Sequence, residues 1–187
     1  MMRTTFEETM IAHCAATLAG HKAGSLFSYR LSAVESPEQY MATLAPLLTA
    51  KGVEVRLLKR CQDGCLVYVY RPGMLAGILR EKDTADFLHT LGYPTDDLDG
   101  CFRLLSERIR CGKEFPHEIG VFLAYPLADV LGFIANHGDN YCCLGCWKAY
   151  GNAEAAERRF NLYRKCRRIY LSCYHRGFSL SRLTVAA

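Results

Sequence analysis

Two prolines inside one apolar stretch constrain the fold of this chain more than any other feature of its sequence. Residues 115 to 150 are rich in apolar residues and contain Pro116 and Pro126. Proline has a fixed φ and no backbone N–H, so it suits the first position of a helix and disrupts a helix interior. The stretch therefore predicts two short helices, one from about Pro116 to Ala124 and one from about Pro126 to Asn136.

The rest of the chain alternates between helical and strand patterns. Capping residues, apolar spacings of three and four, and glycine or proline stops predict the helices, whereas short β-rich runs predict the strands. The further predicted helices run from a cap at Thr4 or Thr5 to about Leu18, from Pro37 to about Leu48, from Pro72 to Leu79, from a cap at Asp83 or Thr84 to Leu91, from about Asp96 to Cys111, and from a cap at Asn152 to about His175. The predicted strands are Ser25 to Tyr29, Val53 to Lys59, Cys65 to Tyr70 and Tyr141 to Tyr150.

The order of these elements predicts the fold class. Gln62-Asp63-Gly64 separates two β-rich runs and indicates a hairpin. Several helices packed on a small, mostly antiparallel sheet give an α+β fold. The chain has 187 residues and no internal repeat, low-complexity run or linker, so we expect one α+β domain over residues 1–187.

The amino-acid sequence also bears on the cellular compartment of the protein. No run approaches the roughly 18 apolar residues of a membrane span, and the first eight residues lack a signal-peptide pattern. We therefore expect a cytoplasmic protein with no membrane partner. The ten cysteines form no regular framework, so the prediction is reduced thiols that mostly fill the core, in an organism that meets little oxygen.

Positive charge is concentrated at the C-terminal end. Residues 151–187 carry a formal charge of +6, whereas the preceding 150 residues carry −2. This balance is weaker than the footprint of a dedicated nucleic-acid binder. It leaves open a non-enzymatic adaptor whose last helix binds an acidic protein or nucleic acid.

A helical wheel divides the last predicted helix into two sides. The basic residues opposite its apolar side are Arg158, Arg164, Lys165 and Arg168. Arg159 and Arg167 fall at the margin of the apolar side, where a covered guanidinium needs a carboxylate, phosphate or carbonyl partner. Both are candidate ligand-binding residues, with Asp129 and Glu118 as the alternative internal partners.

A histidine and a cysteine adjoin in the first predicted helix. His13 and Cys14 suggest a nucleophile, because an imidazolium or a cation such as Lys22 lowers a thiol pKa. Adjacent residues on a helix point apart, so a pairing of Cys14 with His117 across space is an alternative. A buried core thiol is the simpler interpretation.

His117 and Glu118 fall in the first turn of the helix predicted from Pro116. The positive end of a helix dipole favours the carboxylate and disfavours the imidazolium there. His117 is therefore a candidate base, hydrogen-bond donor or ligand, with Glu118 as a catalytic partner or as plain support for the helix end.

Cys143 and Cys146 have the C-x-x-C spacing of a zinc knuckle or a redox pair. A tetrahedral site needs two more ligands, and no second C-x-x-C occurs. Alternation along a strand would also send the two thiols to opposite faces. We expect no metal site, although a metal-handling protein stays an alternative.

Aromatic residues gather near the same stretch. The set that could line a pocket for a flat ligand, such as a flavin or tetrapyrrole, is Tyr68, Tyr70, Tyr125, Tyr141, Trp147 and Tyr150. Such residues also serve as ordinary core. No glycine-rich phosphate loop, nucleophile elbow or H-E-x-x-H motif is present.

A set of short motifs spreads over nearly the whole chain. In order they are His13-Cys14, Thr17-Leu-Ala-Gly20, Lys22, Ser25-Leu-Phe27, His117-Glu-Ile-Gly120, Tyr125-Pro126, Asp129-Val-Leu-Gly-Phe-Ile134, Gly145, Trp147-Lys148, Tyr150-Gly151 and Leu183-Thr-Val185. Together they make the chain resemble the domain-of-unknown-function family numbered 3793, small bacterial proteins mostly of anaerobes. The chain departs from that family at Ala16, where the family has proline, and at Cys146, where it has an aromatic residue.

The resemblance implies no activity. It does imply a shared motif set comprising His13, Cys14, Lys22, His117, Glu118 and Trp147. We therefore expect the first helix and residues 115–150 to form one pocket that binds a small anionic ligand or a redox cofactor. In that pocket Lys22 would supply charge, His117 proton transfer and Cys14 a nucleophile or soft ligand. The sequence identifies no particular cofactor, reaction or oligomeric state.

Overall fold

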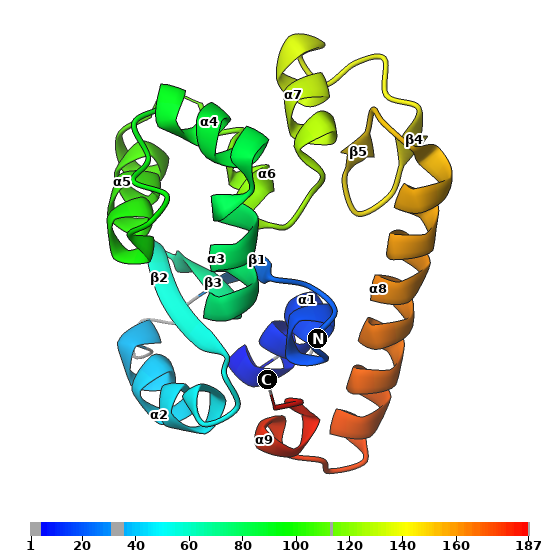
Figure 1. Ribbon diagram of the computed structural model, residues 1–187. Coiled ribbons are helices and arrows are strands. Elements are labelled where there is room, and N and C mark those ends of the chain that lie inside the picture. The colour runs from blue at the N-terminus through cyan, green and yellow to red at the C-terminus, as the bar shows by residue number, and fades with distance from the viewer. Residues whose placement is uncertain (1–4, 31–35, 113, 187) are drawn as a thin grey trace. The chain divides into compact units, whose positions relative to one another are not determined.

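The fold is α+β, as seen in a computed structural model that describes residues 5–30, 36–112 and 114–186 (Figure 1). The predicted cap at Thr4 lies outside the described residues. The helices are α1 Phe6–Leu18, α2 Pro37–Thr49, α3 Pro72–Arg80, α4 Lys82–Thr90, α5 Leu98–Cys111, α6 Ile119–Phe122, α7 Leu127–Ala135, α8 Ala153–His175 and α9 Leu180–Leu183. The strands are β1 Gly24–Arg30, β2 Glu54–Cys61, β3 Gly64–Tyr70, β4 Cys143–Leu144 and β5 Lys148–Ala149.

The chain divides into two compact units. The first unit comprises Met1–Met74 and Lys165–Ala187, and the second comprises Leu75–Arg164. Helix α8 begins in the second unit and ends in the first.

The first unit is built on an antiparallel sheet with strand order β1-β3-β2. The pairs Phe27↔Val67 and Tyr29↔Cys65 fix the register of β1 on β3. The predicted hairpin around Asp63 is confirmed, and a bulge interrupts β2 between Leu57 and Lys59. One face of this sheet carries the core of the unit.

Helices α1 and α2 supply the other side of that core. Thr5 caps α1 through its side chain, which accepts a hydrogen bond from the Glu8 N–H at 3.1 Å. The Phe6 ring of α1 stacks on Tyr40 of α2 at 4.6 Å between centroids. The apolar stripe that the sequence predicts in α1 is fully buried: Met10, Ile11, Cys14, Ala15 and Leu18.

A buried arginine ties the ends of the first unit together. The Arg71 side chain is 4% exposed and donates to the backbone carbonyls of Thr17 at 2.7 Å, Leu18 at 2.8 Å and Val185 at 2.7 Å. Two of these carbonyls end α1, where helical acceptors lack partners. The Arg71 cation also meets the negative end of the α1 dipole.

Phe122 lies at a buried aromatic contact in the second unit. This side chain of α6 is 0% exposed and lies 5.5 Å from the Tyr93 ring and 6.1 Å from the Phe102 ring of α5. Helix α7 follows α6 directly and packs on the small hairpin formed by β4 and β5. The start of α8 covers that hairpin through Phe160.

Three predicted elements of the second unit differ in the structure. Only Ile119–Phe122 of the helix expected from Pro116 to Ala124 is helical, because residues 117 and 118 form a turn. The single strand expected from Tyr141 to Tyr150 is a hairpin of two two-residue strands, since the chain turns back at Gly145 and Cys146. Helix α4 starts earlier than a cap at Asp83 or Thr84 predicts, with Glu81 at its N-cap.

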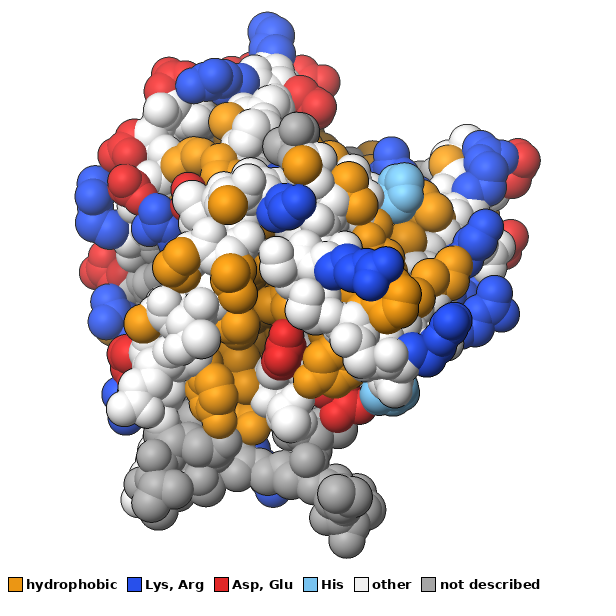
Figure 2. All heavy atoms as spheres, turned by 90° about the horizontal axis from the view of Figure 1, so that it is seen from below, with side chains coloured by type: hydrophobic (Ala, Val, Ile, Leu, Met, Phe, Trp, Pro, Cys, Tyr) orange, Lys and Arg blue, Asp and Glu red, His pale blue; other side chains and the backbone are white. Residues whose placement is uncertain are grey.

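The long helix α8 matches its predicted two-sided pattern. Asn152 caps it, accepting a hydrogen bond from the Ala155 N–H at 2.9 Å. Its buried residues are Ala156, Phe160 and Cys166, and Arg158, Arg164, Lys165 and Arg168 are exposed. Figure 2 shows basic side chains along the edge that α8 forms. No helix made of described residues has an apolar run long enough to cross a bilayer.

Replacing Arg71 with methionine should destabilise the first unit. The substitution removes the donors of three carbonyl contacts, two buried and one partly buried, so we expect the free energy of unfolding to fall by about 3 kcal/mol. Urea denaturation followed by far-UV circular dichroism measures this change. Arg60→Met is the control, because the Arg60–Glu38 ion pair is about half exposed and should contribute far less to stability. Equal losses in the two variants would contradict the role given to Arg71.

Candidate functional site

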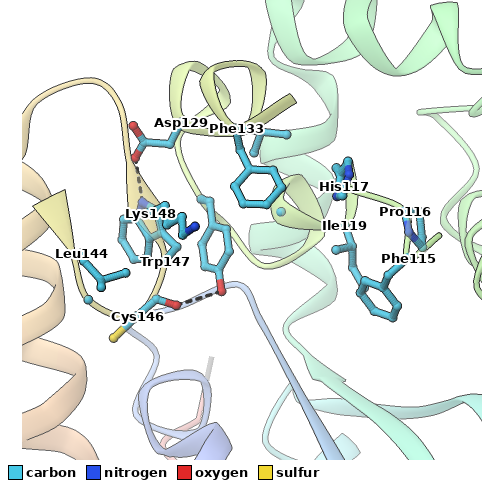
Figure 3. Close-up of a pocket in the computed structure, with 14 residues that line it drawn as sticks. Phe115, Pro116, His117, Ile119, Asp129, Phe133, Leu144, Cys146, Trp147 and Lys148 are labelled. Atoms are coloured by element: carbon cyan, nitrogen blue, oxygen red, sulfur yellow. Dashed lines mark hydrogen bonds between the residues drawn. The ribbon is translucent and has the colours of Figure 1, made fainter. Parts of the chain in front are cut away.

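The candidate site is a pocket of about 420 Å³ that lies entirely in the second unit (Figure 3). Three segments form it: residues 115–120 from the turn before α6 into that helix, residues 125–133 leading into and along α7, and the β4–β5 hairpin. The lining residues are Phe115, Pro116, His117, Ile119, Gly120, Tyr125, Asp129, Val130, Phe133, Leu144, Gly145, Cys146, Trp147 and Lys148. The volume falls in the range of small-molecule sites, and the lining is mainly apolar and aromatic.

A buried carboxylate holds the hairpin on α7. Asp129 is 4% exposed, and its Oδ2 accepts a hydrogen bond from the Trp147 indole N–H at 2.7 Å. Its Oδ1 accepts from the backbone N–H groups of Tyr150 and Gly151, both at 2.8 Å. Three donors therefore satisfy one buried negative charge, as a buried carboxylate requires.

Trp147 is fixed from both sides. Its indole stacks on the Tyr125 ring at 4.7 Å and meets Phe160 edge-on at 4.5 Å. Gly145 packs directly against the Phe160 ring, and a Cβ at this position would overlap that ring. Burial first, then the nearby Cys146 and Tyr163, raise the pKa of Tyr125 to about 12, so its hydroxyl stays protonated at neutral pH. That hydroxyl donates to the Cys146 carbonyl at 3.4 Å.

His117 and Glu118 face different surroundings although they adjoin in sequence. His117 is exposed, lines the pocket, and meets the Phe133 ring edge-on at 5.0 Å. Glu118 is 4% exposed and does not line the pocket. Its Oε1 accepts from the Tyr93 hydroxyl at 2.9 Å and pairs with the Arg108 guanidinium at 2.6 Å. Both residues precede α6, so the predicted position in its first turn is wrong.

Lys148 brings positive charge to the pocket. Its ammonium donates to the Gly138 carbonyl at 2.7 Å and lies over two rings, 5.1 Å from the centroid of Tyr141 and 6.0 Å from that of Phe133. Among the described residues, no carboxylate lies within ion-pair distance of this ammonium. Two of its three N–H donors therefore remain for another acceptor.

The N-terminal candidates lie in the first unit. His13 is exposed and its ring lies parallel to Phe27 at 6.3 Å. Partial burial and the Arg167 guanidinium lower the pKa of His13 below its ordinary value. Cys14 is 0% exposed, and burial raises the pKa of its thiol far above the ordinary value, which the Lys22 ammonium only partly offsets. One pocket that unites these residues with His117 stays a prediction.

The marginal arginines of α8 are both exposed. Arg159 lines a second, smaller cavity of about 140 Å³ together with Glu81, Thr84 and the start of α7. Neither suggested internal partner binds it, because Asp129 accepts from Trp147 and the hairpin backbone, and Glu118 pairs with Arg108. Ligand binding by Arg159 and Arg167 stays a prediction.

The ten cysteines, all within the described residues, are present as thiols. The Cys142 thiol donates to the Ala149 carbonyl at 3.2 Å, and the Cys143 thiol lies 3.9 Å from Glu157. Across the described part of the chain, no three His, Cys, Asp or Glu side chains come together as metal ligands would. The turn between Cys143 and Cys146 replaces the strand alternation on which the sequence argument relied.

The pocket is lined by two members of the predicted aromatic set and by residues that the sequence analysis did not propose as site residues. Tyr125 and Trp147 line it, whereas Tyr68 and Tyr70 lie on β3 of the first unit and stack on each other. Phe133 and Lys148 were missed. The available signals were the nearly continuous apolar sequence of α7, more than a one-sided helix needs, and a lysine directly after the tryptophan.

Replacing Asp129 with asparagine should release the hairpin from α7. The amide keeps one oxygen as an acceptor, but an NH2 group replaces the other oxygen and places a donor against an N–H donor. We therefore expect the free energy of unfolding to fall by about 3 kcal/mol. Trp147 is the only tryptophan, so a red shift of the fluorescence emission maximum reports its exposure. Asp139→Asn, at an exposed site just before the hairpin, is the control and should leave the emission unchanged. An unchanged emission maximum in Asp129→Asn would show that Asp129 does not hold the hairpin on α7.

Cys14 should react slowly in the native protein. Its raised pKa keeps it protonated and its burial excludes reagents, so iodoacetamide at pH 8 should label the exposed Cys61 and Cys111 well before Cys14. Peptide mass spectrometry measures the order of labelling. The same shift makes the stability of the folded state decline as the pH rises above about 9.0, because only the unfolded thiol then ionises. Labelling of Cys14 ahead of the exposed thiols would instead support the nucleophile hypothesis.

Comparison with known proteins gives a family and no functional relative. No curated protein and no solved structure matched the chain significantly. A match to the family described as "Protein of unknown function (DUF3793)" covers residues 10–184. The match includes the second unit with the whole pocket and most of the first unit, and by this extent the chain belongs to the DUF3793 family.

Proposed function

We propose that the pocket of the second unit binds a small ligand with an apolar body and one anionic group. The observation that carries the proposal is Lys148, a cation at an apolar pocket whose ammonium pairs with no described carboxylate. An anion placed there would gain a charge-assisted hydrogen bond. The surrounding rings would remove the apolar body of the ligand from water.

Two exposed apolar side chains of the pocket support a bound molecule. Leu144 and Phe115 are 62% and 47% exposed, and both line the pocket. Large apolar side chains that cluster around a hollow often mark a binding site. Lys148 comes from the hairpin, and Figure 3 shows His117 across Phe133 from it. A ligand between them would meet a cation at one end and a proton donor or acceptor at the other.

Matched brominated probes test the proposal on the intact protein. Bromine quenches tryptophan fluorescence on contact, and Trp147 is the only tryptophan. We expect 4-bromobenzoate and 6-bromohexanoate to quench Trp147 at concentrations about tenfold lower than their neutral amides. The expected preference corresponds to about 1.4 kcal/mol for the contact with Lys148.

Lys148→Met should abolish the preference for the acids over the amides and leave amide binding nearly unchanged. Arg110→Gln removes an exposed positive charge of the same unit outside the pocket, so it should keep the preference. The proposal fails if no probe quenches Trp147, or if acids and amides bind the native protein equally.

A further inference from the structure

We infer that the ligand class is an aryl carboxylate, a planar ring of one or two fused rings with its acid group attached directly to the ring. This inference rests on the proposed function and names the shape of the ligand body. It follows from how the rings, the ammonium and the size of the pocket are arranged.

Flat side chains dominate the walls. The aromatic lining residues, counting the imidazole, are Phe115, His117, Tyr125, Phe133 and Trp147. They come from the turn before α6, the residue before Pro126, α7 and the hairpin, so each segment that forms the pocket contributes at least one ring.

These rings hold fixed positions before any ligand arrives. Tyr125 is stacked on Trp147, with an angle of 23° between the planes, and Trp147 is locked by Phe160 and Asp129. Phe133 is held edge-to-face with His117. A rigid aromatic surface stacks on a flat ring with little loss of entropy, whereas a flexible chain must be ordered on binding.

The position of the cation connects the acid group to the ring. The Lys148 ammonium lies 6.0 Å from the centroid of Phe133, so the charge and a ring face adjoin. A ligand ring stacked on Phe133 brings a carboxylate on its own edge next to this ammonium. An acid at the end of a long chain would leave the ring surface or the ammonium unused.

The volume limits the number of rings. About 420 Å³ is at the lower end for small-molecule sites, which favours one or two fused rings and disfavours a tetrapyrrole.

Ring saturation gives a direct test, because it keeps the carbon skeleton and the charge and removes planarity. We compare 4-bromobenzoate with 4-bromocyclohexanecarboxylate as quenchers of Trp147, and unlabelled 2-naphthoate with decahydronaphthalene-2-carboxylate as competitors of 4-bromobenzoate in a calorimetric titration. The aromatic acid of each pair should bind about fivefold more tightly, the effect of roughly one aromatic contact. The hydrophobic effect alone predicts the reverse, because a saturated ring exposes more apolar surface.

Phe133→Leu should reduce this ratio to about one, and Ile134→Ala, at an exposed position of the same helix outside the pocket, should keep it. A second readout uses the native protein alone: ring currents should shift the proton resonances of bound 2-naphthoate upfield. A ratio of one or less in the native protein, with both acids still preferred over amides, overturns the aryl class and leaves the proposed function standing. No quenching by any acid overturns both.

Discussion

The carboxylate of Asp129 is the interaction on which the candidate site depends. The β4–β5 hairpin has two residues in each strand, far too few backbone hydrogen bonds to persist alone. Asp129 adds three acceptor contacts from α7 and places Trp147 against Tyr125. This one side chain therefore joins two of the three segments that form the pocket. Because the carboxylate is buried, the loss of any of its hydrogen-bond donors would destabilise the fold.

Local sequence signals predicted most of the fold. Caps at Thr5 and Asn152, the Asp63-Gly64 turn and the prolines at positions 72 and 126 act within a few residues, so they could be recognised without knowledge of the tertiary structure. The failures fall where distant contacts decide. The short α6 follows a turn anchored by the Glu118–Arg108 pair, and the chain reversal at Gly145 lies against Phe160.

The site was predictable only in part. His117, Tyr125 and Trp147 could be named from residue type and motif, and they line one pocket. The sequence could not show that Glu118, unlike His117, does not line the pocket. Its carboxylate is instead bound by a tyrosine hydroxyl and an arginine guanidinium. Cys14 illustrates the same limit: its position on the apolar stripe predicted burial, while its neighbours suggested reactivity. For Cys14, the helical spacing was a better guide than the neighbours in sequence, because the direction of a side chain decides which residues it contacts.

The contact between Gly145 and Phe160 has a mechanical consequence. No space for a Cβ lies between Gly145 of the hairpin turn and the Phe160 ring at the start of α8, so the two are in close contact. A side chain larger than hydrogen at position 145 would therefore displace Phe160 and disturb the beginning of α8 within the second unit.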